Sequence, residues 1–166
     1  GMMYRIAKEV AKEYPEIDLW DTNIDAQMMW WTKNPEVYGV LVAENMFGDI
    51  ISDGFAGLVG GLGFACSANI GEEVAVFEPT HGSAPKYAEL KPSIVNPMAM
   101  FLSACMMLDH IDEQNISTKI RNSIGQVVEE GKVRSYDMMK LRGGADAIGK
   151  GAATTQQITD TVIEHL

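Results

Sequence analysis

Apolar side chains recur along this chain with helical spacing in several long stretches, and short apolar runs lie between them. The first such stretch, residues 2–13, predicts an amphipathic helix that ends at Tyr14-Pro15. Further helices are expected over 44–59, 97–108, 116–130 and 154–166, and strands over 17–24, 37–43 and 74–77. The order strand, helix, strand, helix predicts an α/β fold with a parallel sheet.

The same spacing predicts the side chains that pack inward. The helix over 97–108, which Asn96-Pro97 should cap, is apolar throughout and is expected to be fully buried. Thr154 or Thr155 should cap the last helix. In the other helices the inward residues are Met3, Ile6, Ala7, Val10 and Ala11; Ile50, Phe55, Leu58 and Val59; Ile120, Ile124, Val127 and Val128; and Ile158, Val162 and Leu166.

Residues 26–31, Ala-Gln-Met-Met-Trp-Trp, predict a further short helix that Asn34-Pro35 closes. Four large apolar side chains in succession leave some on every face of a helix. Such a helix must be buried nearly all round, and a chain of 166 residues offers little interior for it. A helix of a second subunit would cover it, and an ordinary core position is the alternative.

Glycines at positions 57, 60, 61 and 63 are expected to break the preceding helix. The run lies at a helix end, and no Lys-Ser or Lys-Thr follows it. It is therefore neither a P-loop nor a dinucleotide fingerprint, and tight turning is the better interpretation.

Composition and charge narrow the function classes. The chain is 46% hydrophobic and 22% charged, with a formal net charge of −10, which argues against binding nucleic acid or an anionic membrane. That charge still permits a local basic pocket for a phosphate. The sequence shows no signal-peptide pattern and no apolar run long enough to span a bilayer, so a cytoplasmic location is expected. Cys66 and Cys105 lie far apart in apolar surroundings and are expected to be free thiols.

Two aspartates form the first candidate site. Asp49 and Asp53 are four residues apart, which places both carboxylates on one face of a helix, one turn apart. Like charges there repel by a few tenths of a kcal/mol, and a divalent cation would offset this. The alternative is a solvated acidic helix start that favours the positive end of the helix dipole.

A second candidate is the segment 78–87, Glu-Pro-Thr-His-Gly-Ser-Ala-Pro-Lys-Tyr. Its prolines, glycine and polar residues predict a structured loop, the kind of segment that often carries function. His81 taken alone is more typical of an ordinary surface residue.

These segments resemble those of a known family. Residues 45–53, Asn-Met-Phe-Gly-Asp-Ile-Ile-Ser-Asp, resemble the metal-binding signature of the β-decarboxylating dehydrogenases, which comprise isocitrate, isopropylmalate, homoisocitrate and tartrate dehydrogenases. Residues 77–85 resemble the adenine-nucleotide loop of that family, and residues 68–72 also have a counterpart. Asp25, 24 residues before Asp49, stands where the family has a third metal-site aspartate. The resemblance covers essentially the whole chain.

The resemblance implies an oxidative decarboxylation. In the family, Mg²⁺ or Mn²⁺ holds a 2-hydroxy acid substrate and stabilises the enolate left when CO₂ departs. Asp49 and Asp53 would serve the metal from one subunit, and Asp25, which has a catalytic as well as a metal role, would come from the other. The resemblance thus implies a homodimer with a shared metal site, and the helices over 25–33 and 49–62 are expected at its interface.

The resemblance also implies a cofactor. Members that use NAD commonly have an acidic residue after the position of Pro85, whereas Lys86-Tyr87, with Tyr136 and Lys140 further on, resembles NADP-dependent isocitrate dehydrogenases. NADP is therefore expected rather than NAD, and isocitrate rather than isopropylmalate or homoisocitrate. Lys86 and Lys140 would otherwise be ordinary surface lysines. The expected nucleotide-binding residues are Asn69, Glu78, Thr80, His81, Gly82, Ser83, Ala84, Lys86, Tyr87, Asn96, Tyr136 and Lys140.

The chain departs from the family in length. It resembles only the C-terminal part, and the family's substrate-binding arginines and serine, its tyrosine proton donor and its catalytic lysine have no counterpart here. The chain alone is therefore expected not to turn over substrate, whether it is a fragment, a split-gene half with a separate N-terminal partner, or a degenerate paralogue.

The expected fold is a partial isocitrate/isopropylmalate dehydrogenase-like one, a parallel or mixed sheet flanked by helices. Residues 1–63 would end the small dimerisation domain, and 64–166 the large nucleotide-binding domain. The alternatives in function are a non-catalytic dimerisation or regulatory module of this fold, or a metal-dependent hydrolase that uses the same aspartates. The hydrolase would need a general base, and the nucleotide loop accounts better for His81.

Overall fold

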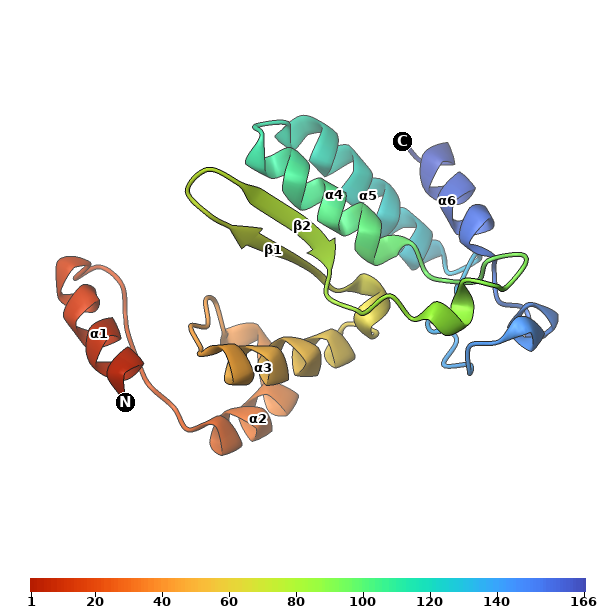
Figure 1. The fold of residues 1–166 in the computed structure, drawn as a ribbon. Coiled ribbons are helices and arrows are strands. Elements are labelled where there is room, and N and C mark those ends of the chain that lie inside the picture. Colours follow the sequence, from red (N-terminus) through yellow and green to blue (C-terminus); the bar gives the residue numbers. More distant parts are fainter. The chain divides into compact units, whose positions relative to one another are not determined.

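The computed structural model describes all 166 residues and divides into two compact units, Gly1–Leu58 and Val59–Leu166. The N-terminal unit holds three α-helices, with 3₁₀ turns after the first and second. They are α1 (Met2–Val10), α2 (Ile24–Lys33) and α3 (Asn45–Leu58), coloured red to yellow-brown in Figure 1. The assignment of the two parts to a dimerisation and a nucleotide-binding domain stays a prediction.

The C-terminal unit consists of a two-stranded ribbon, three helices and the loops between them. The strands β1 (Cys66–Ile70) and β2 (Ala75–Pro79) pair antiparallel, with Ala68 opposite Phe77. The ribbon packs on α4 (Met98–His110), α4 packs on α5 (Gln114–Glu130), and α5 packs on α6 (Thr155–Glu164), as Figure 1 shows.

The main core of this unit lies between α4, α5 and α6. Met98 and Ile158 have no exposed surface, and Ser123 on α5 donates a hydrogen bond to the Val162 carbonyl of α6. A capping box starts α6, because the Thr154 hydroxyl accepts a hydrogen bond from the Gln157 amide while the Gln157 side chain accepts one from the Thr154 amide. The buried members of the core are Met98, Ile124, Val127, Ala153, Ile158 and Val162.

A second, smaller core organises the loops rather than the helices. It is formed by Ile94, Ala147 and Ala152, all buried, and Leu90 and Tyr136 pack against it. The segment before α4 and the segment around Tyr136 therefore share one apolar support, although they are more than 40 residues apart in the sequence.

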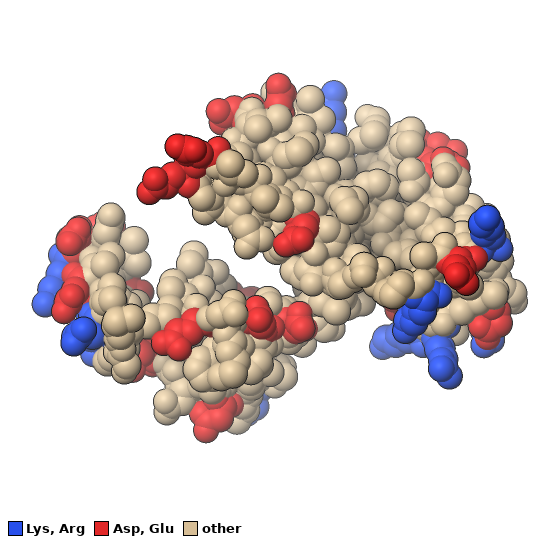
Figure 2. Space-filling model, in the orientation of Figure 1, with Lys and Arg blue, Asp and Glu red and all other residues tan.

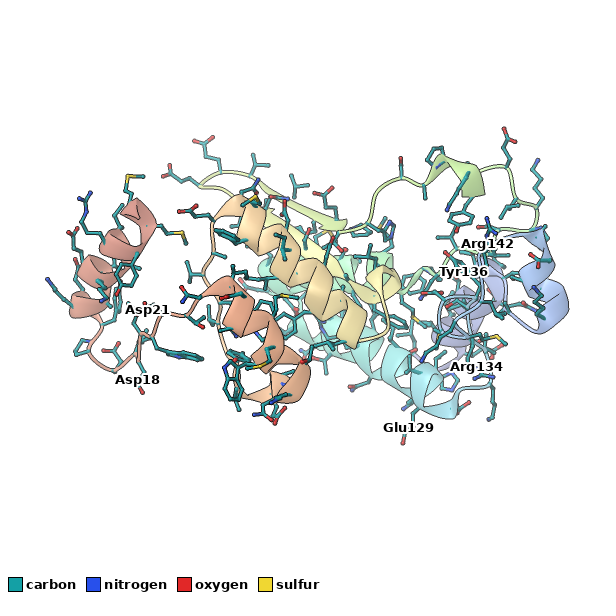
Figure 3. All side chains as sticks on the ribbon, turned by 90° about the horizontal axis from the view of Figure 1, so that it is seen from below. Asp18, Asp21, Glu129, Arg134, Tyr136 and Arg142 are labelled. Atoms are coloured by element: carbon teal, nitrogen blue, oxygen red, sulfur yellow. The ribbon has the colours of Figure 1, made fainter.

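Two of the predicted strands are wrong. Residues 17–23 are irregular and exposed, and residue 24 begins α2; residues 37–43 form the end of a 3₁₀ turn followed by irregular chain. An extended segment becomes a strand only where a neighbour completes its hydrogen-bond ladder, and neither segment has one in this chain. Asp21 contacts α1 instead, where its carboxylate accepts a hydrogen bond of 3.4 Å from the Tyr4 hydroxyl (Figure 3).

The sheet also differs from the parallel one expected. The single sheet of the chain is the antiparallel β1–β2 ribbon. The predicted strand over 74–77 is confirmed as β2, which begins one residue later, at Ala75, whereas β1 was not predicted. Residues 66–70 alternate apolar and polar as a strand does, but the run is only five residues long and contains alanine and asparagine, which are poor strand formers.

Every predicted helix is present, but several inward faces are wrong. In α3 the buried residue is Ala56, while Ile50 and Leu58 are exposed; Val59, just after the helix, is exposed as well. The helix α4 is not fully buried, because Met100 and Met107 are exposed. Helical spacing predicts an apolar stripe, but the covering partner decides whether that stripe is buried. The other expected inward residues found exposed are Ile6, Val10, Val128 and Leu166.

Three further expectations are met. Gly60 and Gly61 both have positive φ, of 115° and 111°, so they make the tight turn that only glycine adopts without strain. Gly57, also expected to break the helix, lies within α3 instead. Cys66 and Cys105 are free. None of the helices combines the length and apolar character needed to cross a membrane.

We expect Ile158→Ala to lower the free energy of unfolding by about 3 kcal/mol, because it opens a cavity in the main core. Ile163→Ala, a control on the same helix at a position 59% exposed, should change it by less than about 0.5 kcal/mol. Urea unfolding of both variants measures the difference. Equal effects would show that α6 does not pack as described.

We expect stability to depend on pH through His165. Hydrogen bonds to the Thr161 carbonyl at 2.8 Å and to the Glu130 carboxylate at 3.3 Å raise the pKa of His165 above its usual 6.5. Lys132, and after it His165, lower the pKa of Glu130. The other charged group facing His165 is Glu164 on its own helix.

Because the pKa of His165 is higher in the folded state, its contribution is complete below the unfolded-state pKa and disappears as pH rises through the folded-state pKa. His165→Gln should therefore reduce the free energy of unfolding at about pH 6 and have little effect at about pH 9. Denaturant unfolding of both proteins across this range measures the effect. A difference that stays constant with pH would contradict this role.

Candidate metal and nucleotide sites

The three predicted metal-site aspartates all lie exposed on the N-terminal unit. Asp49 and Asp53 project from α3 one turn apart, and no lysine or arginine pairs with either. Asp25 lies in the first turn of α2, where one carboxylate oxygen accepts a hydrogen bond of 2.8 Å from the Ala26 amide. The other oxygen of Asp25 accepts no hydrogen bond from the chain.

A single chain does not gather these aspartates into a metal site. No group of three histidine, cysteine or acidic side chains lies close enough together to hold a metal ion. Their carboxylates are the oxygen ligands that Mg²⁺ and Mn²⁺ prefer, so the donor chemistry fits a hard cation. A complete site would need ligands from outside one chain, and the predicted metal roles stay predictions.

The helix α2 is buried on one side only. Gln27 and Trp31 are each 2% exposed, and the Trp31 ring lies 4.7 Å from the Phe55 ring of α3. Met29 and Trp30 remain exposed, as do Met46 and Ile50 on α3. The sequence predicts that α2 is either covered by a second subunit or placed in an ordinary core. The core position accounts only for the face that carries Gln27 and Trp31.

The predicted nucleotide residues all lie in the C-terminal unit, the first of them on the ribbon. Asn69 donates a hydrogen bond of 3.3 Å to the Glu78 carboxylate across the two strands, on the ribbon's exposed face. The loop then leaves β2, with the Thr80 amide donating to the Ala65 carbonyl at 3.2 Å. Two of the twelve predicted residues are thus already in contact before the loop begins.

The loop bends sharply before a 3₁₀ turn. His81 donates from Nδ1 to the neighbouring Gly82 carbonyl, and Gly82 and Ser83 are exposed. Ala84 has a left-handed backbone with φ of 42°, which turns the chain into the 3₁₀ turn Pro85–Tyr87. The ammonium of Lys86 lies 4.8 Å from the centroid of the Tyr87 ring, so these two side chains form a local pair.

Tyr136 comes to the same place from a distant segment. Its ring centroid lies 5.8 Å from that of Tyr87. The Leu141 amide donates to the Tyr136 carbonyl at 2.8 Å and closes a tight loop, in which Lys140 takes a positive φ of 55°. Figure 3 shows Tyr136 and Arg142 within this part of the C-terminal unit. The structure therefore brings Lys86, Tyr87 and Tyr136 together.

The environment of Tyr136 is partly apolar. Burial, together with the adjacent Tyr87 hydroxyl, raises the pKa of Tyr136 to about 12. Its phenol consequently stays protonated at neutral pH and can donate a hydrogen bond to a ligand anion.

Asn96 is buried, and its contacts identify a residue that the sequence analysis missed. The Asn96 side chain accepts a hydrogen bond from the Met98 amide at the start of α4 and donates one of 3.0 Å to Asp137. Gly63 packs so closely that a Cβ there would overlap the Asp137 carboxylate. Asp137 therefore holds Asn96 in place. In the sequence, the only sign of this role is that Asp137 follows Tyr136. Sequence spacing alone does not distinguish a carboxylate that supports a neighbour from one on the surface.

Basic side chains concentrate around these loops. Residues 84–92 and 132–150 contain seven of the chain's 13 basic residues and only three of its 23 acidic ones. Figure 2 shows blue side chains clustered over this end of the C-terminal unit. Only Lys132 and Lys150 among them are in ion pairs, with Glu130 and Asp146. The chain is acidic as a whole, yet this surface favours an anion. The other basic residues here are Lys86, Lys91, Arg134, Lys140 and Arg142.

Comparisons with known proteins find one family. The family model described as isocitrate/isopropylmalate dehydrogenase matches residues 2–162. Over 166 residues the chain is 44% identical to an isocitrate dehydrogenase [NADP] from Thermus thermophilus, covering all of this chain and 32% of that protein. It is 48% identical over 132 residues to a 3-isopropylmalate dehydrogenase from Archaeoglobus fulgidus, covering 80% of this chain and 40% of the relative.

The fold agrees as well. The crystal structure of isocitrate dehydrogenase from Methylococcus capsulatus superposes with a TM-score of 0.85 at 39% identity, over 98% of this chain and 44% of that one. The chain therefore belongs to the isocitrate/isopropylmalate dehydrogenase family, whose members named here are dehydrogenases, and the expected α/β fold class is confirmed. It spans less than half the length of each of these relatives.

Proposed function

We propose that this chain supplies the metal-binding aspartates and the adenosine side of the cofactor pocket to a decarboxylating dehydrogenase that oxidises isocitrate with NADP. The observation that carries the proposal is the meeting of Lys86, Tyr87 and Tyr136 at one place on a basic surface. The groups that bind the substrate carboxylates and donate the final proton come from residues outside this sequence. The chain alone is expected to be inactive.

The preference for NADP follows from the charge and hydrogen-bonding capacity of this surface. NADP differs from NAD by a phosphate on the adenosine ribose. Lys86 and Lys140 supply positive charge to such a phosphate, and the phenols of Tyr87 and Tyr136 donate hydrogen bonds. Acidic residues that would repel the phosphate are rare here, Glu89 and Asp146 being exposed examples, and Asp146 is already paired with Lys150.

The choice of isocitrate rests on the NADP preference. Isopropylmalate and homoisocitrate remain the alternatives within the same reaction. In each case the substrate is a small 2-hydroxy acid whose hydroxyl is oxidised and whose β-carboxylate leaves as CO₂.

The metal site is proposed to lie between two copies of the chain. Asp49 and Asp53 of one copy would bind Mg²⁺ or Mn²⁺, and Asp25 of the other would complete the carboxylate set. The bound metal would stabilise negative charge on the substrate oxygen during oxidation and decarboxylation. The exposed apolar side chains Met29, Trp30, Met46 and Ile50, which lie on α2 and α3 beside these aspartates, would be covered by the second copy.

We expect Mn²⁺ binding to depend on self-association, because the site takes ligands from both copies. Titration calorimetry at several protein concentrations should show Mn²⁺ affinity that rises as the protein dimerises in the ultracentrifuge. Asp53→Asn should weaken Mn²⁺ binding at least about tenfold, because a charged ligand is lost. Asp18→Asn, an exposed aspartate outside the proposed site, is the matched control. A monomer that binds Mn²⁺ with unchanged affinity in the Asp53 variant would contradict the shared site.

We expect the double substitution Lys86→Asp and Tyr87→Ile to reverse the cofactor preference. The variant loses a cation and a hydrogen-bond donor and gains a carboxylate that repels the phosphate but can bind ribose hydroxyls. The ratio of NADP to NAD affinity, measured by calorimetry, should fall by at least about tenfold. Lys119→Asp, near the start of α5, makes the same charge change outside the proposed site. If the unmodified protein already prefers NAD, the NADP assignment is wrong.

A further inference from the structure

We propose that Gly143 is a positioning residue for Tyr87, and that its lack of a side chain contributes to the preference for NADP. The inference concerns a residue outside the set predicted to touch the cofactor. It rests on the proposed function for its effect on specificity, but the contact with Tyr87 stands independently of any cofactor.

Gly143 lies directly against the side chain of Tyr87. A Cβ at this position would overlap the Tyr87 hydroxyl oxygen and would lie 2.8 Å from two carbons of the Tyr87 ring. Carbon atoms do not approach so closely without one of them moving. The Tyr87 ring therefore occupies the volume that any other residue at position 143 would fill.

The backbone gives no second reason for glycine here. Gly60, Gly61, Gly131 and Gly151 have positive φ and are explained by their conformation, whereas Gly143 does not. The neighbouring Gly144 has an extended φ of 174°, which any residue adopts. Space for Tyr87 is thus the feature that distinguishes position 143.

Tyr87 cannot relieve the overlap by shifting its backbone. Its amide donates to the Ala84 carbonyl at 3.0 Å, and its carbonyl accepts from the Leu90 amide at 3.2 Å. Leu90 in turn packs on the second core with Tyr136. We therefore expect a side chain at position 143 to rotate the Tyr87 ring and to displace the phenol from its place beside Tyr136.

The consequence is specific to the extra phosphate. A displaced Tyr87 phenol loses its proposed hydrogen bond to the phosphate of NADP, while NAD has no group at that position. Gly143→Ala should accordingly weaken NADP binding about tenfold, the value of one charge-assisted hydrogen bond, and leave NAD binding nearly unchanged.

The experiment has a structural and a functional arm. In the structural arm, ring-labelled tyrosine NMR, assigned with Tyr87→Phe and Tyr136→Phe, detects the contact between the two rings. We expect that contact in the unmodified protein and in the control Gly149→Ala, where a Cβ meets nothing within 4 Å, but not in Gly143→Ala. Persistence of the ring contact in Gly143→Ala would overturn the proposal.

In the functional arm, calorimetry with NADP and with NAD gives the affinity ratio for Gly143→Ala, Tyr87→Ala and the double variant. If Gly143 acts through Tyr87, adding Gly143→Ala to Tyr87→Ala should cause no further loss. In the double variant no Tyr87 ring remains for the new Cβ at position 143 to overlap. A further loss of NADP affinity in that variant, or its failure to fold, would therefore overturn the proposal. If the unmodified protein binds neither nucleotide or prefers NAD, the proposed function fails, and the NMR arm still decides the placement of Tyr87.

Discussion

The hydrogen bond from Asn96 to Asp137 is the interaction on which the arrangement of the loops that carry Tyr87 and Tyr136 depends. It joins the start of α4 to the segment that carries Tyr136, across 41 positions of sequence. The close approach of Gly63 adds a third segment, the turn that precedes β1. Because Asn96 also accepts a hydrogen bond from the Met98 amide, the loops are anchored to the same helix that starts the main core. A partly buried polar pair is costly unless its partners are well placed, so this hydrogen bond favours one arrangement of the loops over others.

Around this anchor, charge is distributed against the trend of the whole molecule. A chain with a net charge of −10 would repel a dinucleotide phosphate from most of its surface. Seven basic residues lie in the two segments that the second core joins, and most of them have no acidic partner. Because the rest of the chain is acidic, the surface around these basic residues is the most favourable place for an anion. Tyr87 and Tyr136 add phenol donors; the raised pKa of Tyr136 keeps its phenol protonated at neutral pH, and the second core against which Tyr136 packs limits its movement.

The N-terminal unit has the opposite character, since much of its apolar surface is uncovered. Trp31 of α2 packs against Phe55 of α3, but Trp30, the residue before it, is 46% exposed. Large apolar side chains beside unpaired aspartates are unusual on the surface of a finished monomer. They are understandable if α2 and α3 meet a second copy, which would bury the apolar side chains and bring a third aspartate to the other two. The same contact would thus serve stability and metal binding together.

The sequence by itself determined the helices, their main caps and the family. Helical spacing and local signals such as Asn96-Pro97 and Thr154 act within a few residues, so they are readable without knowing the fold. The motifs around Asp49 and His81 identified the family because the resemblance is carried by consecutive residues. The tertiary structure decided the rest. The strands expected at 17–24 and 37–43 found no neighbour to complete a ladder, and the faces of α3 and α4 were set by what lies against them. Asp137 and Gly143 acquire their roles only because folding brings them beside Asn96 and Tyr87, and contacts between distant segments leave no periodic signal in the sequence.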